Sequence, residues 1–123
     1  MSTSVVLVDD DAEFRVLARR VLSGTGLWVV GEADTVATAL VAAGHLRPDA
    51  LLVDVGLPDG DGITLARELA ALPWRPRVVL TSIDPDAASP REVHHSGADG
   101  FAPKDDLPNA GVRLLLGSEE GVA

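Results

Sequence analysis

Short apolar runs alternate along this chain with segments whose apolar residues recur every three or four positions. Five runs rich in Val, Leu and Ala cover residues 4–8, 27–31, 50–53, 77–80 and 98–102. Runs of this length predict β-strands, and nearly continuous apolar character is typical of strands buried on both faces. Helical spacing follows each run. The alternation predicts five βα units, which is an α/β fold with a parallel sheet covered by helices on both sides.

Capping residues mark where several helices begin. We expect Asp11 to cap the first helix, and Asp34 or Thr35 to cap the second. The third helix is expected over 63–72. Prolines at 85 and 90 prevent one long fourth helix, so it should be short and begin at Pro90, with Ser89 as its cap.

The spacing of apolar residues also predicts which helix faces are turned inward. For the second helix the predicted inner residues are Val36, Leu40 and Val41. For the last helix they are Leu107, Ala110, Gly111 and Leu114.

Length and composition bound the possibilities. The 123 residues predict a single domain, 1–123, with a core over about 4–117 and no output domain. The chain has no Cys, which excludes disulfides and thiolate metal sites. No stretch approaches the roughly 18 apolar residues that cross a membrane, so a cytoplasmic protein without a membrane partner is the default expectation. A net charge of -9 argues against direct binding of nucleic acid by this domain.

Chemically capable side chains follow the predicted strands. Asp9 and Asp10 come after the first strand, Asp54 after the third, Thr81 after the fourth, and Lys104 beyond the fifth. Ligands of an open parallel sheet bind outside the carboxyl ends of its strands, so these groups are expected at one edge. Carboxylates without His or Cys favour Mg²⁺. A metal, an ammonium and a hydroxyl around a nucleophilic carboxylate are what phosphoryl transfer requires.

With these residues in place, the chain resembles the receiver domains of two-component response regulators. The matching segments are VVLVDD (5–10), LLVDVGLPDGDGI (51–63), VVLTS (78–82) and GADGFAPKDDL (97–107). The resemblance implies a flavodoxin-like (βα)5 fold with strand order 2-1-3-4-5. It also allows a cis peptide before Pro103.

The resemblance further implies a role for each residue of the site. Asp54 matches the phosphoacceptor, and Asp9 and Asp10 match the acidic pair that holds Mg²⁺ together with Asp54 and the backbone carbonyl of Gly56. Thr81 and Lys104 match the groups that contact the phosphoryl group. Thr81 and Phe101 match the switch pair.

The resemblance implies a sensor histidine kinase as partner and homodimerisation on phosphorylation. The 97–107 segment is similar to receivers fused to LuxR-type DNA-binding domains, which implies transcription regulation. The domain is expected to be no enzyme beyond hydrolysing its own acyl phosphate.

Two other interpretations stay open. Ser82 and the proline-interrupted segment 84–96 suggest a receiver that works as an interaction module without phosphorylation. Asp9-x-Asp11 suggests a phosphohydrolase of the haloacid dehalogenase type, although Glu13 does not fit that motif and no sequence is left for a cap domain. Asp59 and Asp61 are interpreted as turn residues, and the adjacent His94 and His95 as surface residues.

Overall fold

A five-stranded parallel sheet forms the centre of the protein, in a computed structural model that describes residues 3–117 apart from the side chains of Ala110 and Leu114. The strands are β1 (Thr3–Val8), β2 (Leu27–Ala33), β3 (Ala50–Asp54), β6 (Arg77–Ser82) and β7 (Gly100–Pro103). They lie in the order β2-β1-β3-β6-β7. Because β6 and β7 are the fourth and fifth strands of this sheet, the predicted order 2-1-3-4-5 is confirmed.

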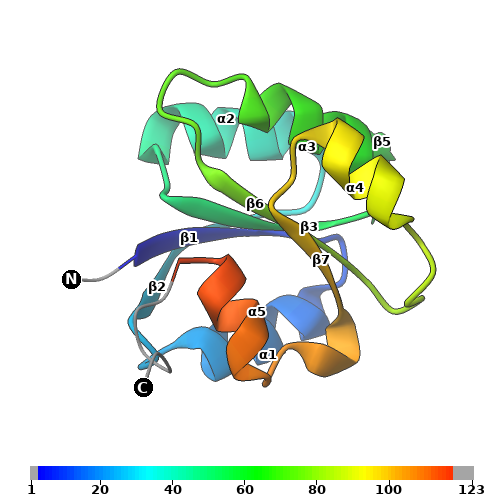
Figure 1. Cartoon of the computed structure of the whole chain (residues 1–123). Coiled ribbons are helices and arrows are strands. Elements are labelled where there is room, and N and C mark those ends of the chain that lie inside the picture. The colour runs from blue at the N-terminus through cyan, green and yellow to red at the C-terminus, as the bar shows by residue number, and fades with distance from the viewer. Residues whose placement is uncertain (1–2, 118–123) are drawn as a thin grey trace.

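Helices cover both faces of the sheet (Figure 1). One face carries α1 (Ala12–Leu22) and α5 (Ala110–Leu115), and the other carries α2 (Val36–Leu46), α3 (Gly62–Ala70) and α4 (Pro90–Ser96). The buried apolar side chains form two clusters accordingly, one containing Phe14 and the other containing Leu65. This is the flavodoxin-like α/β architecture that the alternating pattern predicts. None of the helices within 3–117 has both the length and the apolar character needed to span a bilayer.

Local signals explain the helix starts. Asp11 caps α1 by accepting from the N–H groups of Glu13 and Phe14. At α4, Ser89 and Glu92 exchange side-chain-to-backbone hydrogen bonds of 3.1 and 3.0 Å, and Pro90 occupies the first helical position. The predicted start and cap of α4 are therefore confirmed, and the helix is short but regular, with seven residues.

The predicted inner face of α2 is confirmed for Val36, which packs against the core, but is wrong for Leu40 and Val41. Ala39 and Ala43 are fully buried against the sheet, whereas Val41 is 60% exposed and Leu40 is 36% exposed. The sequence VATALVAAGHL is apolar nearly all round, so its spacing does not select a face. Alanine packs there because a small side chain lets the helix backbone approach the strands closely.

Three smaller expectations also need correction or fall outside the described side chains. On α5, Gly111 is exposed and Val112 is buried instead. The predicted spacing is counted from Leu107, which lies before the helix begins at Ala110 and so does not set its inward face. The predicted inward placement of Ala110 and Leu114 concerns side chains that are not described. The peptide bond before Pro103 is trans, the form that proline itself slightly favours.

Candidate functional site

The ends of three parallel strands determine where the candidate site lies. Asp9 directly follows β1, Asp54 is the last residue of β3, and Thr81 lies near the end of β6. In the sheet register Val8 pairs with Val53, and Asp54 pairs with Thr81. Asp9, Asp54 and Thr81 therefore lie side by side at the carboxyl edge of the sheet.

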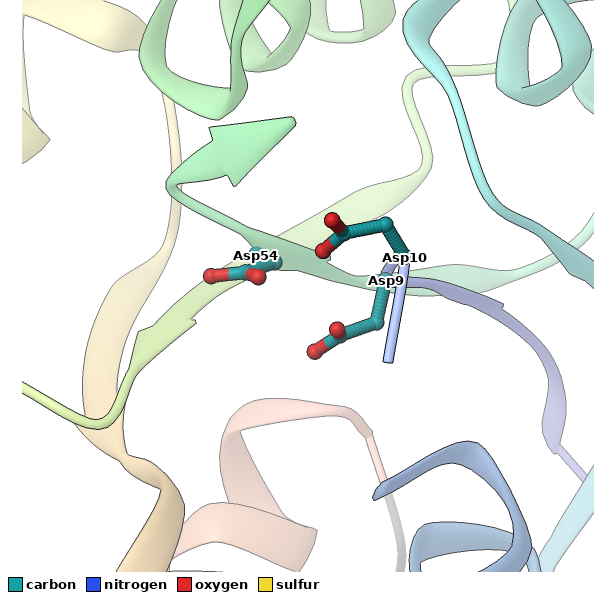
Figure 2. A group of neighbouring side chains, drawn as sticks. All are labelled: Asp9, Asp10 and Asp54. Carbon is teal, nitrogen blue, oxygen red and sulfur yellow. The ribbon is translucent and has the colours of Figure 1, made fainter. Parts of the chain in front are cut away.

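Three carboxylates gather at this edge. One oxygen from each of Asp9, Asp10 and Asp54 lies within 4.8 Å of the others. Figure 2 shows Asp9 and Asp10 leaving neighbouring positions after β1, with Asp54 beside them at the end of β3. Asp9 is 2% exposed and Asp54 is 9% exposed, while Asp10 is open to solvent. The two buried carboxylates need compensating positive charge.

Lys104 provides part of that charge. It begins a short 3-10 helix, Lys104–Asp106, directly after β7. Its Nζ lies 2.8 Å from Oδ2 of Asp9 and 3.7 Å from Oδ2 of Asp54. The ammonium thus contacts Asp9 closely and lies near the carboxylate at the end of β3.

The electrostatics of the site favour a proton or a cation. Burial, followed by the charge of Asp9, raises the pKa of Asp54 to about 6, against the opposing effects of Lys104 and the Gly56 N–H. Burial on its own lowers the pKa of Lys104, but its hydrogen bond to Asp9 and the charge of Asp54 outweigh this and raise it. Even with Lys104 present, the carboxylates are therefore short of positive charge.

These residues fit a hard divalent cation such as Mg²⁺. Oδ2 of Asp9 is buried and receives no hydrogen bond besides its ion pair with Lys104. All three side chains offer carboxylate oxygens, the ligands that Mg²⁺ prefers. Among the residues the structure describes, no other trio of His, Cys, Asp or Glu side chains meets in this way. His94 and His95 are exposed on α4 and belong to no such group.

The loop after β3 is held in place by two aspartates that the sequence marks only as turn residues. It folds as a small antiparallel pair, β4 (Gly56–Leu57) with β5 (Gly60–Asp61). Asp61 caps α3 by accepting from Thr64 N–H at 2.8 Å. Asp59 reaches across to α2 and accepts from the N–H groups of Val36 and Ala37 at 2.7 and 3.1 Å.

Gly56 and Gly62 have distinct roles in this loop. The N–H of Gly56 points to Oδ1 of Asp54 at 3.4 Å, so the residue lies beside the carboxylate, as expected. The carbonyl of Gly56 as a metal ligand stays a prediction. At Gly62, a Cβ atom would collide with the backbone carbonyl of Asp54, which explains why glycine is needed there.

Phe101 lies apart from the carboxylates. It is half-buried on β7 and packs against the cluster that contains α2, α3 and α4. A hollow of about 780 Å³ beside it is lined by α4 residues, among them Val93 and His94. The predicted switch position therefore borders the space under the shortest helix on that face. Its role as a switch is untested by this geometry.

Sequence reasoning missed two residues that touch the site. The ring of Phe14 lies 4.3 Å from Nζ of Lys104. The guanidinium of Arg15 donates to the carbonyl of Asp9 and forms an ion pair of 2.8 Å with Glu32 on β2. Helical spacing marks Phe14 only as a core residue, and Arg15 lies in the same turn. For Arg15, a cation one turn after Asp9-Asp10-Asp11 is the signal that could have drawn attention to it, whereas nothing in the sequence separates Phe14 from an ordinary core residue.

Comparison with known proteins agrees with this geometry. The profile of the response regulator receiver domain matches residues 5–112. The transcriptional activator DevR/DosR of Mycobacterium tuberculosis is 40% identical over 103 residues, which is 82% of this chain and 47% of that protein. The KDP operon transcriptional regulatory protein KdpE of Escherichia coli is 34% identical over 102 residues, which is 83% of this chain and 44% of that protein. The chain thus spans about half the length of these relatives.

Solved structures give the same result. The signal receiver domain of NarL from Mycobacterium tuberculosis superposes with a TM-score of 0.78 at 32% identity, covering 94% of this chain and 98% of that one. The response regulator domain of CheB from Thermotoga maritima has a TM-score of 0.81 at 23% identity, covering 97% of this chain and 99% of that one, and supports the fold alone. The fold, the matched profile and these relatives together show that this chain belongs to the response regulator receiver family of two-component signalling.

Proposed function

We propose that Asp54 accepts a phosphoryl group from a sensor histidine kinase in a Mg²⁺-dependent reaction. The observation that carries the proposal is the position of Asp54. It ends β3 within 4.8 Å of the acidic pair and 3.7 Å from the Lys104 ammonium. A carboxylate with a pKa of about 6 is largely ionised at neutral pH, so it can attack phosphorus.

The chain's own residues supply what the transfer needs. An oxygen of Asp54 forms a bond to phosphorus while the P–N bond of a phosphohistidine breaks, and the imidazole takes up a proton as it leaves. Asp9, Asp10, Asp54 and the Gly56 carbonyl would hold the metal, which offsets charge on the transferring group. Lys104 would pair with one phosphoryl oxygen, and the Thr81 hydroxyl would donate a hydrogen bond to another.

Thr81 and Phe101 are proposed to pass on the change. Thr81 pairs with Ala102 in the β6–β7 register, next to Phe101. A movement of Thr81 toward a phosphoryl group would therefore act on the strand that carries Phe101. The hollow of about 780 Å³ next to that ring gives it room to reorient.

Intact-mass measurement tests the proposal directly. The protein is incubated with acetyl phosphate and Mg²⁺, and a mass gain of one phosphoryl group is expected. Asp54→Asn should show no gain, and chelation of Mg²⁺ should prevent it in the wild type. Asp86→Asn, at an exposed position away from the carboxylates, is the matched control and should react normally. No gain in the wild type, or an equal gain in Asp54→Asn, would overturn the proposal.

The process that this receiver controls is inferred from its relatives. DevR/DosR and KdpE are transcription regulators, so the receiver is inferred to control transcription, with a LuxR-type DNA-binding domain as the expected output. Phosphorylation is expected to favour a homodimer in the cytoplasm. If the domain instead works without phosphorylation, the wild type and Asp54→Asn will bind the same partner with equal affinity.

Hydrolytic activity is expected to be limited to the domain's own acyl phosphate. A phosphohydrolase of the haloacid dehalogenase type needs a second aspartate two residues after the first as a free acid–base group. Asp11 has that spacing from Asp9, but its carboxylate is occupied in capping α1. Multiple turnover of a phosphate ester by the isolated chain would contradict this conclusion.

A further inference from the structure

Lys104 has a third neighbour besides the carboxylates of Asp9 and Asp54. Its Nζ lies 4.3 Å from the centroid of the Phe14 ring, with the ammonium over the ring face. A cation over an aromatic face within about 6 Å is attracted by the ring quadrupole, and more strongly where water is excluded. Lys104 is 11% exposed and Phe14 is 8% exposed, so this contact is largely shielded from solvent.

The ring is held firmly with respect to the site. Phe14 lies in the first turn of α1, whose start is fixed by the Asp11 cap. It belongs to the buried cluster that also contains Leu107, just beyond the short helix that Lys104 begins. The ring therefore cannot move without disturbing either the turn that carries Asp9 and Asp10 or the core beneath it.

The ammonium, by contrast, is carried on a flexible stem. Lysine has four rotatable side-chain bonds, and its ammonium is strongly hydrated when water can reach it. On the outer side of Phe14 lies a hollow of about 390 Å³, bordered by Leu17, Ile83 and Asp105. Lys104 and Phe14 both line this hollow, so the ring covers one side of the ammonium while the hollow lies next to both residues. A smaller or non-aromatic residue would remove the cation–π attraction and open a path for water.

We propose that Phe14 is a positioning residue for Lys104, whose aromatic face holds the ammonium at Asp54 in readiness for a phosphoryl oxygen. The geometric part of this inference stands on the contact itself. Its consequence for reactivity rests on the proposed function. The role differs from core packing, because it depends on the π face of the side chain and not only on its volume.

The sequence allows a direct test, since Lys104 is the only lysine of the chain. Lysine labelled with ¹³C at Cε gives a single NMR signal that needs no assignment. In the wild type, the ring current of Phe14 should move the ε-proton resonances upfield of free lysine. Phe14→Leu should lose this shift, whereas Phe14→Tyr should keep it, because the adjoining hollow has room for the hydroxyl.

Reactivity gives the second measurement. With acetyl phosphate and Mg²⁺, Phe14→Leu is expected to be phosphorylated roughly 3- to 10-fold more slowly, and Phe14→Tyr at close to the wild-type rate. Leu22→Ala, a cavity variant in the same cluster on α1, controls for lost stability. It should lower the melting temperature while leaving the Lys104 resonance in place.

The outcomes separate the two proposals. A Lys104 resonance that is the same in the wild type and in a folded Phe14→Leu variant overturns the inference, and so does a Phe14→Tyr variant that reacts as slowly as Phe14→Leu. A ring-current shift in a wild-type protein that gains no phosphoryl mass supports the positioning of the ammonium and overturns the proposed function instead.

Discussion

Asp54 lies beside two other carboxylates, and burial together with the charge of Asp9 raises its pKa from 3.8 to about 6. Between these two values the folded chain holds a proton that the unfolded chain has released. The stability contributed by this group is therefore present at low pH and is lost as the pH rises through about 6. At neutral pH the ionised Asp54 destabilises the metal-free fold.

Asp54→Asn is accordingly expected to stabilise the metal-free protein at pH 7.5. The amide keeps the shape of the carboxyl group but removes the repulsion by Asp9. We expect a gain in unfolding free energy of about 1 kcal/mol after allowing for solvent screening, and a smaller gain at pH 4.5. Urea unfolding in the presence of a chelator at both pH values measures this. A gain that is the same at both pH values would contradict the electrostatic explanation.

Residue type decides which parts of the site could be predicted from sequence. Asp9, Asp10, Asp54 and Lys104 are charged residues at strand ends, and the structure brings them together as expected. Phe14 could not be singled out, because an apolar residue at helical spacing looks the same whether it packs in the core or faces an ammonium. Charged residues that directly follow apolar strands stand out in the sequence. The position of the Phe14 ring over the ammonium is known only from the structure.

At the scale of elements, the features that could be predicted are those specified by residues adjacent in sequence. The cap of α4 was predictable because Ser89, Pro90 and Glu92 are adjacent and specify the start without help from the rest of the fold. The inward face of α2 could not be predicted, because valine, leucine and alanine lie on all sides of this helix. Only the packing against the strands determines which of them are buried. For Asp59, the sequence predicts a turn residue, but its hydrogen bond to α2 could not be predicted because Asp59 and Val36 are distant in sequence.

The orientation of α2 can be tested with a pair of substitutions. Ala43 is fully buried, so Ala43→Leu should push the helix off the sheet and cost about 1–3 kcal/mol of unfolding free energy. Val41 is 60% exposed, so Val41→Glu should change the unfolding free energy by no more than about 0.5 kcal/mol. Chemical denaturation of both variants measures this. The opposite ranking would restore the face that helical spacing alone predicts.

At the scale of the whole molecule, the fold brings together acidic groups from positions 9, 10 and 54 of the sequence. The net charge is -9, and the parallel arrangement brings the ends of β1 and β3 to one edge with three carboxylates. Such a cluster opposes the compact state by mutual repulsion. The cluster persists because the sheet and its two apolar clusters hold this edge together, so packing elsewhere in the domain offsets the repulsion among the three carboxylates.

Binding of Mg²⁺ should therefore stabilise the entire domain, since the unfolded chain has no preformed site. At a free concentration 100 times the dissociation constant, the expected gain is about 2.7 kcal/mol, seen as a rise in the melting temperature that saturates. NaCl at matched ionic strength separates this from general screening of the acidic chain, and Asp9→Asn should remove the saturable part. Lowering the pH from 7.5 to 5 should weaken the effect, because Asp54 then holds a proton in the metal-free state. If the melting temperature rises equally with NaCl, or if Asp9→Asn responds like the wild type, the three carboxylates do not form a metal site.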